Sequence, residues 1–401
     1  MATIINKQSG ILLQKPFRYT FTSTSLKTEL INTFFIGRNF PINYSPKLRK
    51  RLKEEYDIED NDVEIDLNAG NNELIDNPRT LSFDLLLDYL IDQRKRSKKD
   101  LEKIVHGASI VCRRGVLIKL INAIYYEKGE FIFAVKKFRG IYFIKEISTV
   151  TYQKSNVRRA GDPHTLLPKF KNLIIDPFDD ASYVPPKENS TWEQMQGLYL
   201  CNLSLINSGD SKTLKIFYGT EIDAFDTEDN AIGIKLQRGD FNNDKSLNTP
   251  FMIDKIRKWF FQSHFVNSDT VIVGFHEDKV VNLIKKFNID SLPSMFYPEN
   301  QWNSNYSSTV TILTNVFEFY ENNVSEDETL MVELLPKDTN ILYHVRDDTI
   351  HNVLPREFKE AFEEIIVTLD NVNAETAKSN GPKLQTENAW LDNIIENALN
   401  V

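Results

Sequence analysis

The sequence predicts one large mixed α/β domain. Three observations support this class: strand-like alternation dominates from Phe131 onward, helical segments lie among the strands, and no change of composition divides the body of the chain. With 401 residues, 41% of them hydrophobic, the chain is long enough to bury a sizeable core. We expect residues 1–370 to form the domain, and the polar residues 371–401 to form a linker and a short terminal helix.

The first 80 residues are mixed in character and are interrupted by turn signals. Residues 80–93 have helical periodicity, and the basic run from Arg94 to Lys99 is typical of the solvated end of a helix. Residues 57–66 are acidic but lack the glycine of a calcium-binding loop, so a solvated loop is expected. Further helices are expected at 116–123, 251–264, 278–287, 307–322 and 355–370, and strands at 130–138, 140–147, 197–206, 213–218, 220–225, 231–237, 270–275, 329–335 and 340–345.

Composition narrows the class of protein. The formal net charge of −9 argues against non-specific coating of nucleic acid, although it allows a local basic cleft. Two cysteines, Cys112 and Cys201, argue against a disulfide framework and fit a reducing compartment. No run of 18 apolar residues predicts a membrane span, and the first residues lack the apolar core of a signal peptide. We expect a cytoplasmic protein, with the nucleus as the alternative.

Two carboxylates and a lysine form the most informative motif. Glu221 and Asp223 are two residues apart in a strand-like segment, so their side chains share a face. Hard divalent cations prefer such oxygen ligands, and Lys235, on the next strand-like segment, could lie beside them. A metal held beside a lysine suits phosphodiester hydrolysis, because the metal activates water and neutralises developing charge. The alternative is a solvated strand face with alternating charge.

Other segments are less specific. Arg113 and Arg114 precede a helix-like segment and could bind phosphate, or could be an ordinary surface pair. The segment from Lys136 to Arg139 interleaves charge with an aromatic residue, which suits single-stranded RNA or simply the exposed face of a hairpin. Cys201 lies in a strand, where a buried thiol is expected. Zinc-ligand spacing, a glycine-rich phosphate loop, a serine nucleophile elbow and a dinucleotide fingerprint are all absent from the sequence.

Taken in order, these segments resemble the decapping and exoribonuclease (DXO) family, in its fungal cytoplasmic form, over most of 66–275. The matching pieces are Cys112 to Lys119, Lys137 to Gly140, the strand that begins at Gly197, Tyr218 to Asp223, Ile234-Lys235, Lys258 to Ser263 and Val271 to Phe275. The resemblance implies a single domain on two mixed β-sheets, with a D-(D/E)xK-like nuclease core and flanking helices. It also implies Mg²⁺ or Mn²⁺ as cofactor and a deep pocket that takes the 5′ end of an RNA.

The resemblance assigns roles to individual residues. Glu221, Asp223 and the main-chain carbonyl of Ile234 fall on metal ligands. Lys235 and Gln262 fall on residues that act in catalysis and meet the substrate. Arg114 falls on an arginine that contacts the RNA backbone, and its neighbours Arg113 and Gly115 are expected to help bind the substrate.

Two positions depart from the family pattern. The resemblance places a glutamate at Cys201 and another at Gly233, and neither residue supplies a carboxylate. Because hard cations need charge from their oxygen ligands, both departures would weaken metal affinity. A glycine also weakens the interior of a strand.

The expected function is therefore a metal-dependent hydrolase that removes incomplete or non-standard RNA 5′ caps, including NAD caps, and degrades RNA from the 5′ end in RNA quality control. The alternative is a catalytically weakened member that binds RNA or stabilises a partner 5′–3′ exonuclease. A second alternative, a DNA nuclease, fits the carboxylates and lysine but leaves the segments around Arg114 and Gln262 unexplained. A monomer that does not bind membranes is expected.

Overall fold

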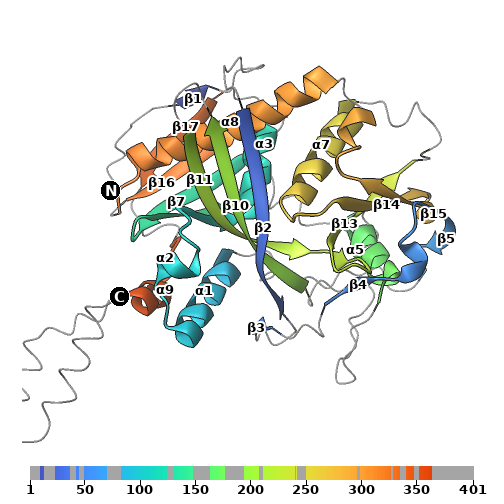
Figure 1. Cartoon of the computed structure of the whole chain (residues 1–401), viewed down its shortest axis with the longest axis horizontal. Coiled ribbons are helices and arrows are strands. Elements are labelled where there is room, and N and C mark those ends of the chain that lie inside the picture. The colour runs from blue at the N-terminus through green and yellow to red at the C-terminus, as the bar shows by residue number, and fades with distance from the viewer. Residues whose placement is uncertain are drawn as a thin grey trace, which may run out of the picture. The chain divides into compact units, whose positions relative to one another are not determined.

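Two mixed β-sheets and the helices around them make up the part of the chain that the computed structural model describes (Figure 1). The described residues are 10–12, 23–36, 42–44, 49–69, 83–123, 130–147, 163–176, 194–206, 211–239, 241, 250–295, 299–326, 328–334, 340–346 and 352–363. The chain divides into two units, Met1–Ala361 and Phe362–Val401. The linker and helix expected at 371–401 lie outside the described residues.

The larger sheet has ten strands, and its longest members lie next to one another. In spatial order the strands are β1 (Gly10–Leu12), β17 (Asn340–Arg346), β16 (Thr329–Leu334), β7 (Phe131–Phe138), β8 (Ile141–Ile147), β6 (Ile110–Arg113), β11 (Ser211–Ile222), β10 (Gln194–Ile206), β2 (Ser23–Ile36) and β3 (Ile42–Asn43). Strand β6 pairs in parallel with both β8 and β11, and the other pairs are antiparallel. The β7–β8 hairpin turns at Arg139 and Gly140, as expected, and both residues have positive φ.

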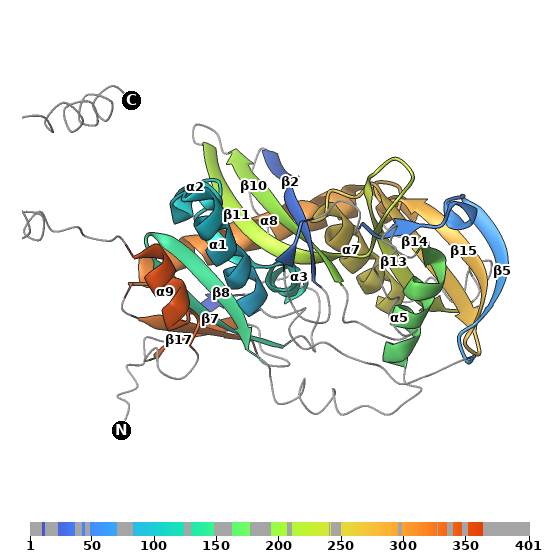
Figure 2. The same ribbon diagram turned by 90° about the horizontal axis from the view of Figure 1, so that it is seen from below.

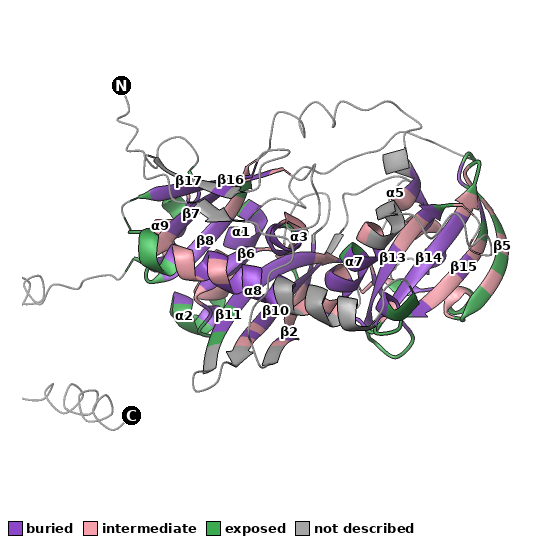
Figure 3. Cartoon of the chain, turned by 90° about the horizontal axis from the view of Figure 1, so that it is seen from above, coloured by how far each residue is buried: buried purple, intermediate pink, exposed green. Residues whose placement is uncertain are grey.

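The smaller sheet has seven strands. In spatial order they are β5 (Asp60–Asp66), β15 (Val280–Asn288), β14 (Thr270–Glu277), β13 (Ala231–Arg238), β12 (Ala224–Phe225), β4 (Arg51–Leu52) and β9 (Ile175–Asp176). Strands β13 and β14 pair in parallel at the centre, and Figure 3 shows them mostly buried, while exposed residues alternate along the edge strand β5.

Helices cover both sheets. They are α1 (Phe83–Ser97), α2 (Leu101–Ile104), α3 (Arg114–Ala123), α5 (Pro163–Ile174), α7 (Pro250–His264), α8 (Glu299–Asn323) and α9 (Arg356–Phe362), with short 3₁₀ turns at Glu54–Tyr56 and Pro293–Met295. Helix α8 packs against β2, β10 and α3, while α7 contacts α3, β13 and β14 (Figures 1 and 2). Helix α5 contacts β13 and β9. None of the described helices is long and apolar enough to cross a membrane.

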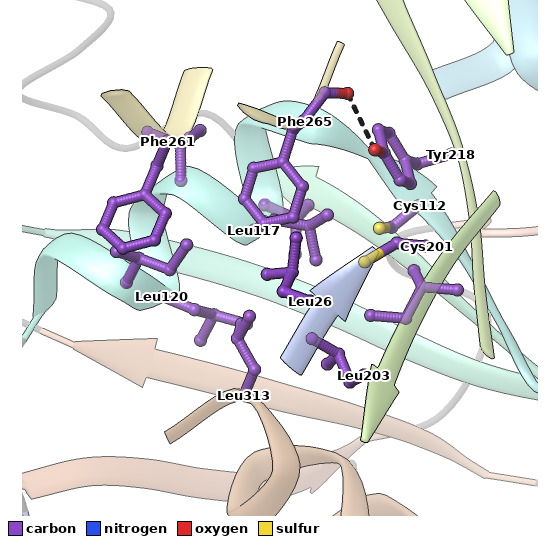
Figure 4. Packing of buried hydrophobic residues seen from close by; sticks show 14 of the residues in the cluster. Leu26, Cys112, Leu117, Leu120, Cys201, Leu203, Tyr218, Phe261, Phe265 and Leu313 are labelled. Atoms are coloured by element: carbon purple, nitrogen blue, oxygen red, sulfur yellow. Dashed lines mark hydrogen bonds between the residues drawn. The ribbon is translucent and has the colours of Figure 1, made fainter. Parts of the chain in front are cut away.

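A single residue links a strand of the larger sheet to a strand of the smaller one. Strand β11 of the larger sheet ends at Ile222, and β12 of the smaller sheet begins at Ala224, so Asp223 is the link between them. One large apolar cluster extends from α3, α7 and α8 to strands of both sheets. Within it the hydroxyl of Tyr218 donates a hydrogen bond of 2.7 Å to the carbonyl of Phe265, which ties β11 to the end of α7 (Figure 4).

This architecture confirms the expected fold class, but two segments differ from their prediction. Residues 278–287 are not a helix: Val280–Asn288 is strand β15, which is paired on both sides, with β14 and with β5. Residues 57–66 are not only a loop, since Asp60–Asp66 is the edge strand β5. Its acidic side chains point outward in alternation, and charges on a sheet edge discourage pairing with other chains. The predicted end of the helix at 364–370 lies outside the described residues.

Candidate active site

The two carboxylates of the sequence motif lie where the sheets join. Glu221 is near the end of β11 and Asp223 follows it in the link to β12; their side chains are 24% and 14% exposed. The amide of Ile234 on β13 donates a 2.8 Å hydrogen bond to Oδ2 of Asp223. This bond holds the Asp223 carboxylate against the smaller sheet. It also replaces a hydrogen bond to water that the carboxylate loses where it is buried.

Strand β13 supplies the third member of the motif. Lys235 lies next to Ile234, and its Nζ is 3.8 Å from Oδ2 of Asp223. Burial lowers the pKa of Lys235 to about 8, although the Asp223 charge opposes this shift. Gly233, two residues earlier, faces the same side of the strand. A Cβ at this position would lie 3.3 Å from Oγ of Ser263 and 3.9 Å from Cε of Lys235.

Two helices close the site from the other side. Arg114 begins α3 immediately after β6, and its Nη1 donates a 3.0 Å hydrogen bond to the main-chain carbonyl of Gln262 on α7. The neighbouring Ser263 is 1% exposed, and its hydroxyl has no hydrogen-bond partner among the described residues. These helices and strands line one small pocket. Its lining residues are Arg114, Glu221, Ile222, Asp223, Ile232, Gly233, Lys235, Gln262, Ser263 and Val266.

A further lysine, which the sequence analysis did not single out, holds both carboxylates. Nζ of Lys171 on α5 lies 2.5 Å from Oδ1 of Asp223 and 3.6 Å from Oε1 of Glu221. Burial alone would lower the pKa of Lys171, but the two carboxylates outweigh burial and raise it above its ordinary value. At Asp223 the shift has the opposite sign. The nearby charges of Lys171 and Lys235, and the hydrogen bonds from Lys171 and the Ile234 amide, outweigh burial and hold the pKa of its carboxyl well below its usual range.

The structure brings most of the predicted site residues together. Glu221, Asp223, Lys235, Gln262 and Arg114 line one pocket, and Gly233 lies among them. The signal for α5, which the sequence analysis missed, is the four-residue spacing of its buried apolar residues, Leu166, Phe170 and Ile174.

Four predicted residues do not line this pocket, and one of them is Ile234, whose main-chain amide donates to Asp223. Cys201 lies opposite Ile216 on β11, five residues before Glu221, and its thiol is buried with Cys112 in the apolar cluster of Figure 4. The structure therefore does not bring Cys201 to the carboxylates. Arg113 donates a 3.0 Å hydrogen bond to the buried Gln196 instead, and Gly115 lies exposed on α3, next to Glu146.

A family model supports the resemblance. Residues 39–359 match the model of the RAI1-like PD-(D/E)XK nucleases. The chain belongs to this family. Membership confirms the expected class of enzyme, a hydrolase of the nuclease type.

Relatives of this family resemble the chain in sequence and fold. The decapping nuclease dom-3 of Caenorhabditis elegans is 25% identical over 299 residues, which are 71% of this chain and 72% of that protein. The crystal structure of Candida albicans Rai1 in complex with pU5 and Mn²⁺ has a TM-score of 0.68 at 15% identity, covering 89% of this chain and 99% of that one. The crystal structure of Scheffersomyces stipitis Rai1 in complex with (3′-NADP)⁺ and calcium has a TM-score of 0.67 at 15% identity, covering 89% of this chain and 100% of that one.

Nucleases of this kind depend on divalent metal ions, and this pocket offers such an ion fewer free oxygen ligands than the resemblance implies. Gly233 supplies no carboxylate, and no group of three or more His, Cys, Asp or Glu among the described residues could hold a metal. The ammonium of Lys171 already contacts Oδ1 of Asp223, and Lys235 lies 3.8 Å from Oδ2. A divalent cation at the carboxylates would be repelled by both ammonium groups.

Proposed function

We propose that this nuclease-family protein acts on the 5′ end of RNA, where it hydrolyses incomplete or non-standard caps, including NAD caps, and degrades RNA from that end. The observation that carries the proposal is the convergence of Arg114, Lys235 and Gln262 on the two carboxylates at the junction of the sheets. The Candida and Scheffersomyces relatives, whose structures hold pU5 and (3′-NADP)⁺, support this substrate class.

The pocket residues have distinct roles in this proposal. The forked guanidinium of Arg114 has donors left for a phosphate after its bond to the Gln262 carbonyl. Lys235 supplies a compact positive charge at the carboxylates, and burial keeps water from screening it. The bond between Arg114 and Gln262 also joins α3 to α7, and both helices contribute residues to the pocket.

A second candidate function, an RNA-binding member with weak catalysis that can stabilise an exonuclease partner, is favoured by the ion pair of Lys171 with Asp223 and by Gly233. Both features reduce what the site offers to a divalent cation. We also propose that the protein acts as a monomer in the cytoplasm, or alternatively in the nucleus.

Release of label from three substrates would test the first function: RNA with a labelled NAD cap, the same RNA with a 5′ monophosphate, and a DNA of the same sequence. Each is incubated with Mn²⁺, with Mg²⁺ or with a chelator. Cleavage of the RNAs but not the DNA supports the proposal, provided that Lys235→Ala abolishes it. The control is Lys286→Ala, which removes a lysine paired with Asp57 at 2.7 Å outside the pocket. If the RNA binds but is cleaved under none of these conditions, the second candidate is favoured.

A further inference from the structure

The side chains of Arg113 and Gln196 form a bridge across strand β11. Arg113 is the last residue of β6, which pairs with one edge of β11, and Gln196 is on β10, which pairs with the other. Nη1 of Arg113 donates a hydrogen bond of 3.0 Å to Oε1 of Gln196, which is buried. The guanidinium therefore has to cross the face of β11 to make this bond.

Gly219 gives the guanidinium the room to cross. It pairs with Arg113 in the parallel ladder of β11 and β6, and a Cβ on it would lie 3.0 Å from Nη1 of Arg113. Because this distance is shorter than ordinary contacts, a side chain at position 219 would displace the guanidinium. The bridge thus depends on the absence of a side chain at this point of β11.

The bridge passes beside Glu221. Gln196 is directly opposite Glu221 in the antiparallel pair of β10 and β11, and side chains opposed in this way lie on one face with their Cβ atoms about 5 Å apart. Gly219 shares that face, because it precedes Glu221 by two residues on the same strand. The Glu221 side chain therefore has the bridge as a neighbour on its own face of the sheet.

Glu221 also acts on Arg113 through its charge. Burial lowers the pKa of Arg113 to about 10 and the charge of Arg114 lowers it further, whereas the charge of Glu221 opposes this shift. Arg113 remains protonated at neutral pH, so it attracts the Glu221 carboxylate. The nearby anion also offsets part of the cost of removing a guanidinium from water.

We infer that Arg113 is a positioning residue for Glu221: its bridge to Gln196 holds the Glu221 side chain in the direction of the pocket, while its neighbour Arg114 faces the substrate. This role rests on the proposed action on RNA and goes beyond it. The sequence led us to expect that Arg113 binds the substrate, whereas the bridge gives it the separate task of fixing a carboxylate.

Steady-state cleavage of RNA with a labelled 5′ monophosphate tests this role, because positioning and substrate binding change different constants. Arg113→Met and Gln196→Ala should each lower kcat by about tenfold to a hundredfold, the cost of displacing a group of the site by up to about 1 Å. Both should change KM by less than about twofold, because neither removes a contact with the substrate. Arg114→Ala, the matched neighbour, should instead raise KM.

Three further variants show whether the bridge acts as a unit. The double variant Arg113→Met with Gln196→Ala should have the same kcat as either single variant, since each already breaks the bridge. Gly219→Ala retains both partners and displaces only the guanidinium, so it should lower kcat and leave KM unchanged. The control is Ser204→Ala, on the same strand β10 but outside the pocket, where the hydroxyl lies 3.4 Å from that of Thr213. It should change neither constant.

Urea denaturation provides a measurement that does not depend on activity. The variants are Arg113→Met, Glu221→Gln and the combination of the two. Because Glu221→Gln removes the charge that attracts Arg113, Arg113→Met should lower the urea midpoint less in the Glu221→Gln background than in the original chain. The same curves show which variants are folded.

The outcomes separate this role from the proposed function. If Arg113→Met raises KM as Arg114→Ala does and leaves kcat unchanged, Arg113 binds the substrate, and the positioning role is overturned while action on RNA stands. If the losses of kcat in Arg113→Met and Gln196→Ala multiply in the double variant, the two residues do not act as a unit and the role is again overturned. If the original chain cleaves no RNA, the proposed function is wrong and the unfolding measurements decide the role: an equal loss of stability in both backgrounds would overturn it.

Discussion

The ammonium group of Lys171 lies 2.5 Å from Oδ1 of Asp223, although 52 residues separate the two along the chain. Helix α5 carries the lysine and packs on β13, while Asp223 links the two sheets. The ion pair therefore joins α5 to the junction on which the pocket is built. Since Lys171 is also 3.6 Å from Glu221, one lysine contacts both carboxylates of the motif.

Replacement of Lys171 by Ala should destabilise the fold. Asp223 would keep the Ile234 amide and the more distant Lys235 but would lose its closest cation. We expect a loss of about 2 kcal/mol in the free energy of unfolding, less than removal of one partner from a fully buried pair costs, because both side chains are partly exposed. Urea denaturation measures it, with Lys286→Ala, which removes a more exposed lysine, as the comparison. Mn²⁺ should raise the melting temperature of Lys171→Ala but not that of the original chain. Equal stability of Lys171→Ala and the original chain would contradict this account.

Metal binding should appear when the positive charge is removed and a carboxylate is added. In the double variant Lys171→Ala with Gly233→Glu, Glu221 and Asp223 are free of the Lys171 ammonium. A third carboxylate then lies on the same face of β13 as Lys235. Its Cβ needs Ser263 to shift by a few tenths of an ångström. Calorimetry with Mn²⁺ should show binding to the double variant and much weaker binding to each single variant. Equally tight binding of Mn²⁺ by the original chain would mean that Lys171 does not block the site.

The carboxylate and lysine motif was predictable from sequence because its geometry is local. Glu221 lies on β11 and Asp223 one residue beyond its end, and both side chains reach Lys171, as a two-residue spacing on one face predicts; the same rule relates Gly233 to Lys235 on β13. Lys171 was not predictable in this way. Its helix contains Pro168, which argues against a helix, and only the packing of α5 on β13 brings the lysine to the carboxylates.

The same contrast explains the errors in secondary structure. In β15 the apolar residues Val280, Leu283, Ile284 and Phe287 also have the spacing of a helical face, so periodicity alone cannot decide. Pairing with β14 on one side and β5 on the other makes the segment a strand. Such pairing partners lie far away in the sequence, and strand preference depends on them more than helix preference depends on its surroundings.

Gly197 should prove essential for packing rather than for ligand binding. A Cβ on this residue would lie 2.6 Å from Cδ1 of Ile222 and 2.6 Å from Cε2 of Tyr199, which is closer than real contacts allow. Gly197→Ala should therefore lower stability by about 1–3 kcal/mol, the usual cost of overpacking. The control is Gly115→Ala, where the nearest atom is Oε2 of Glu146 at 3.5 Å. Because Gly115 is in α3, its replacement by Ala should be neutral or stabilising by about 0.5–1 kcal/mol. Chemical denaturation that ranks the two variants in the opposite order would contradict this assignment.

Arg114→Ala should weaken RNA binding and leave the fold nearly unchanged. The side chain is half-buried and donates to the Gln262 carbonyl, so its loss removes one helix contact and one candidate phosphate contact. A charge-assisted contact to phosphate contributes about 1.5–3 kcal/mol, which corresponds to about tenfold or more in affinity. The control is Arg356→Ala, which removes an arginine that is 88% exposed and paired with Glu360 on α9, away from the pocket. Titration of 5′-phosphorylated RNA at several salt concentrations should show a higher dissociation constant and a flatter salt dependence for Arg114→Ala only, because one phosphate contact and its released counterion are lost. If both variants bind with the same affinity and the same salt slope, Arg114 is a structural contact between α3 and α7 and does not line the path of the RNA.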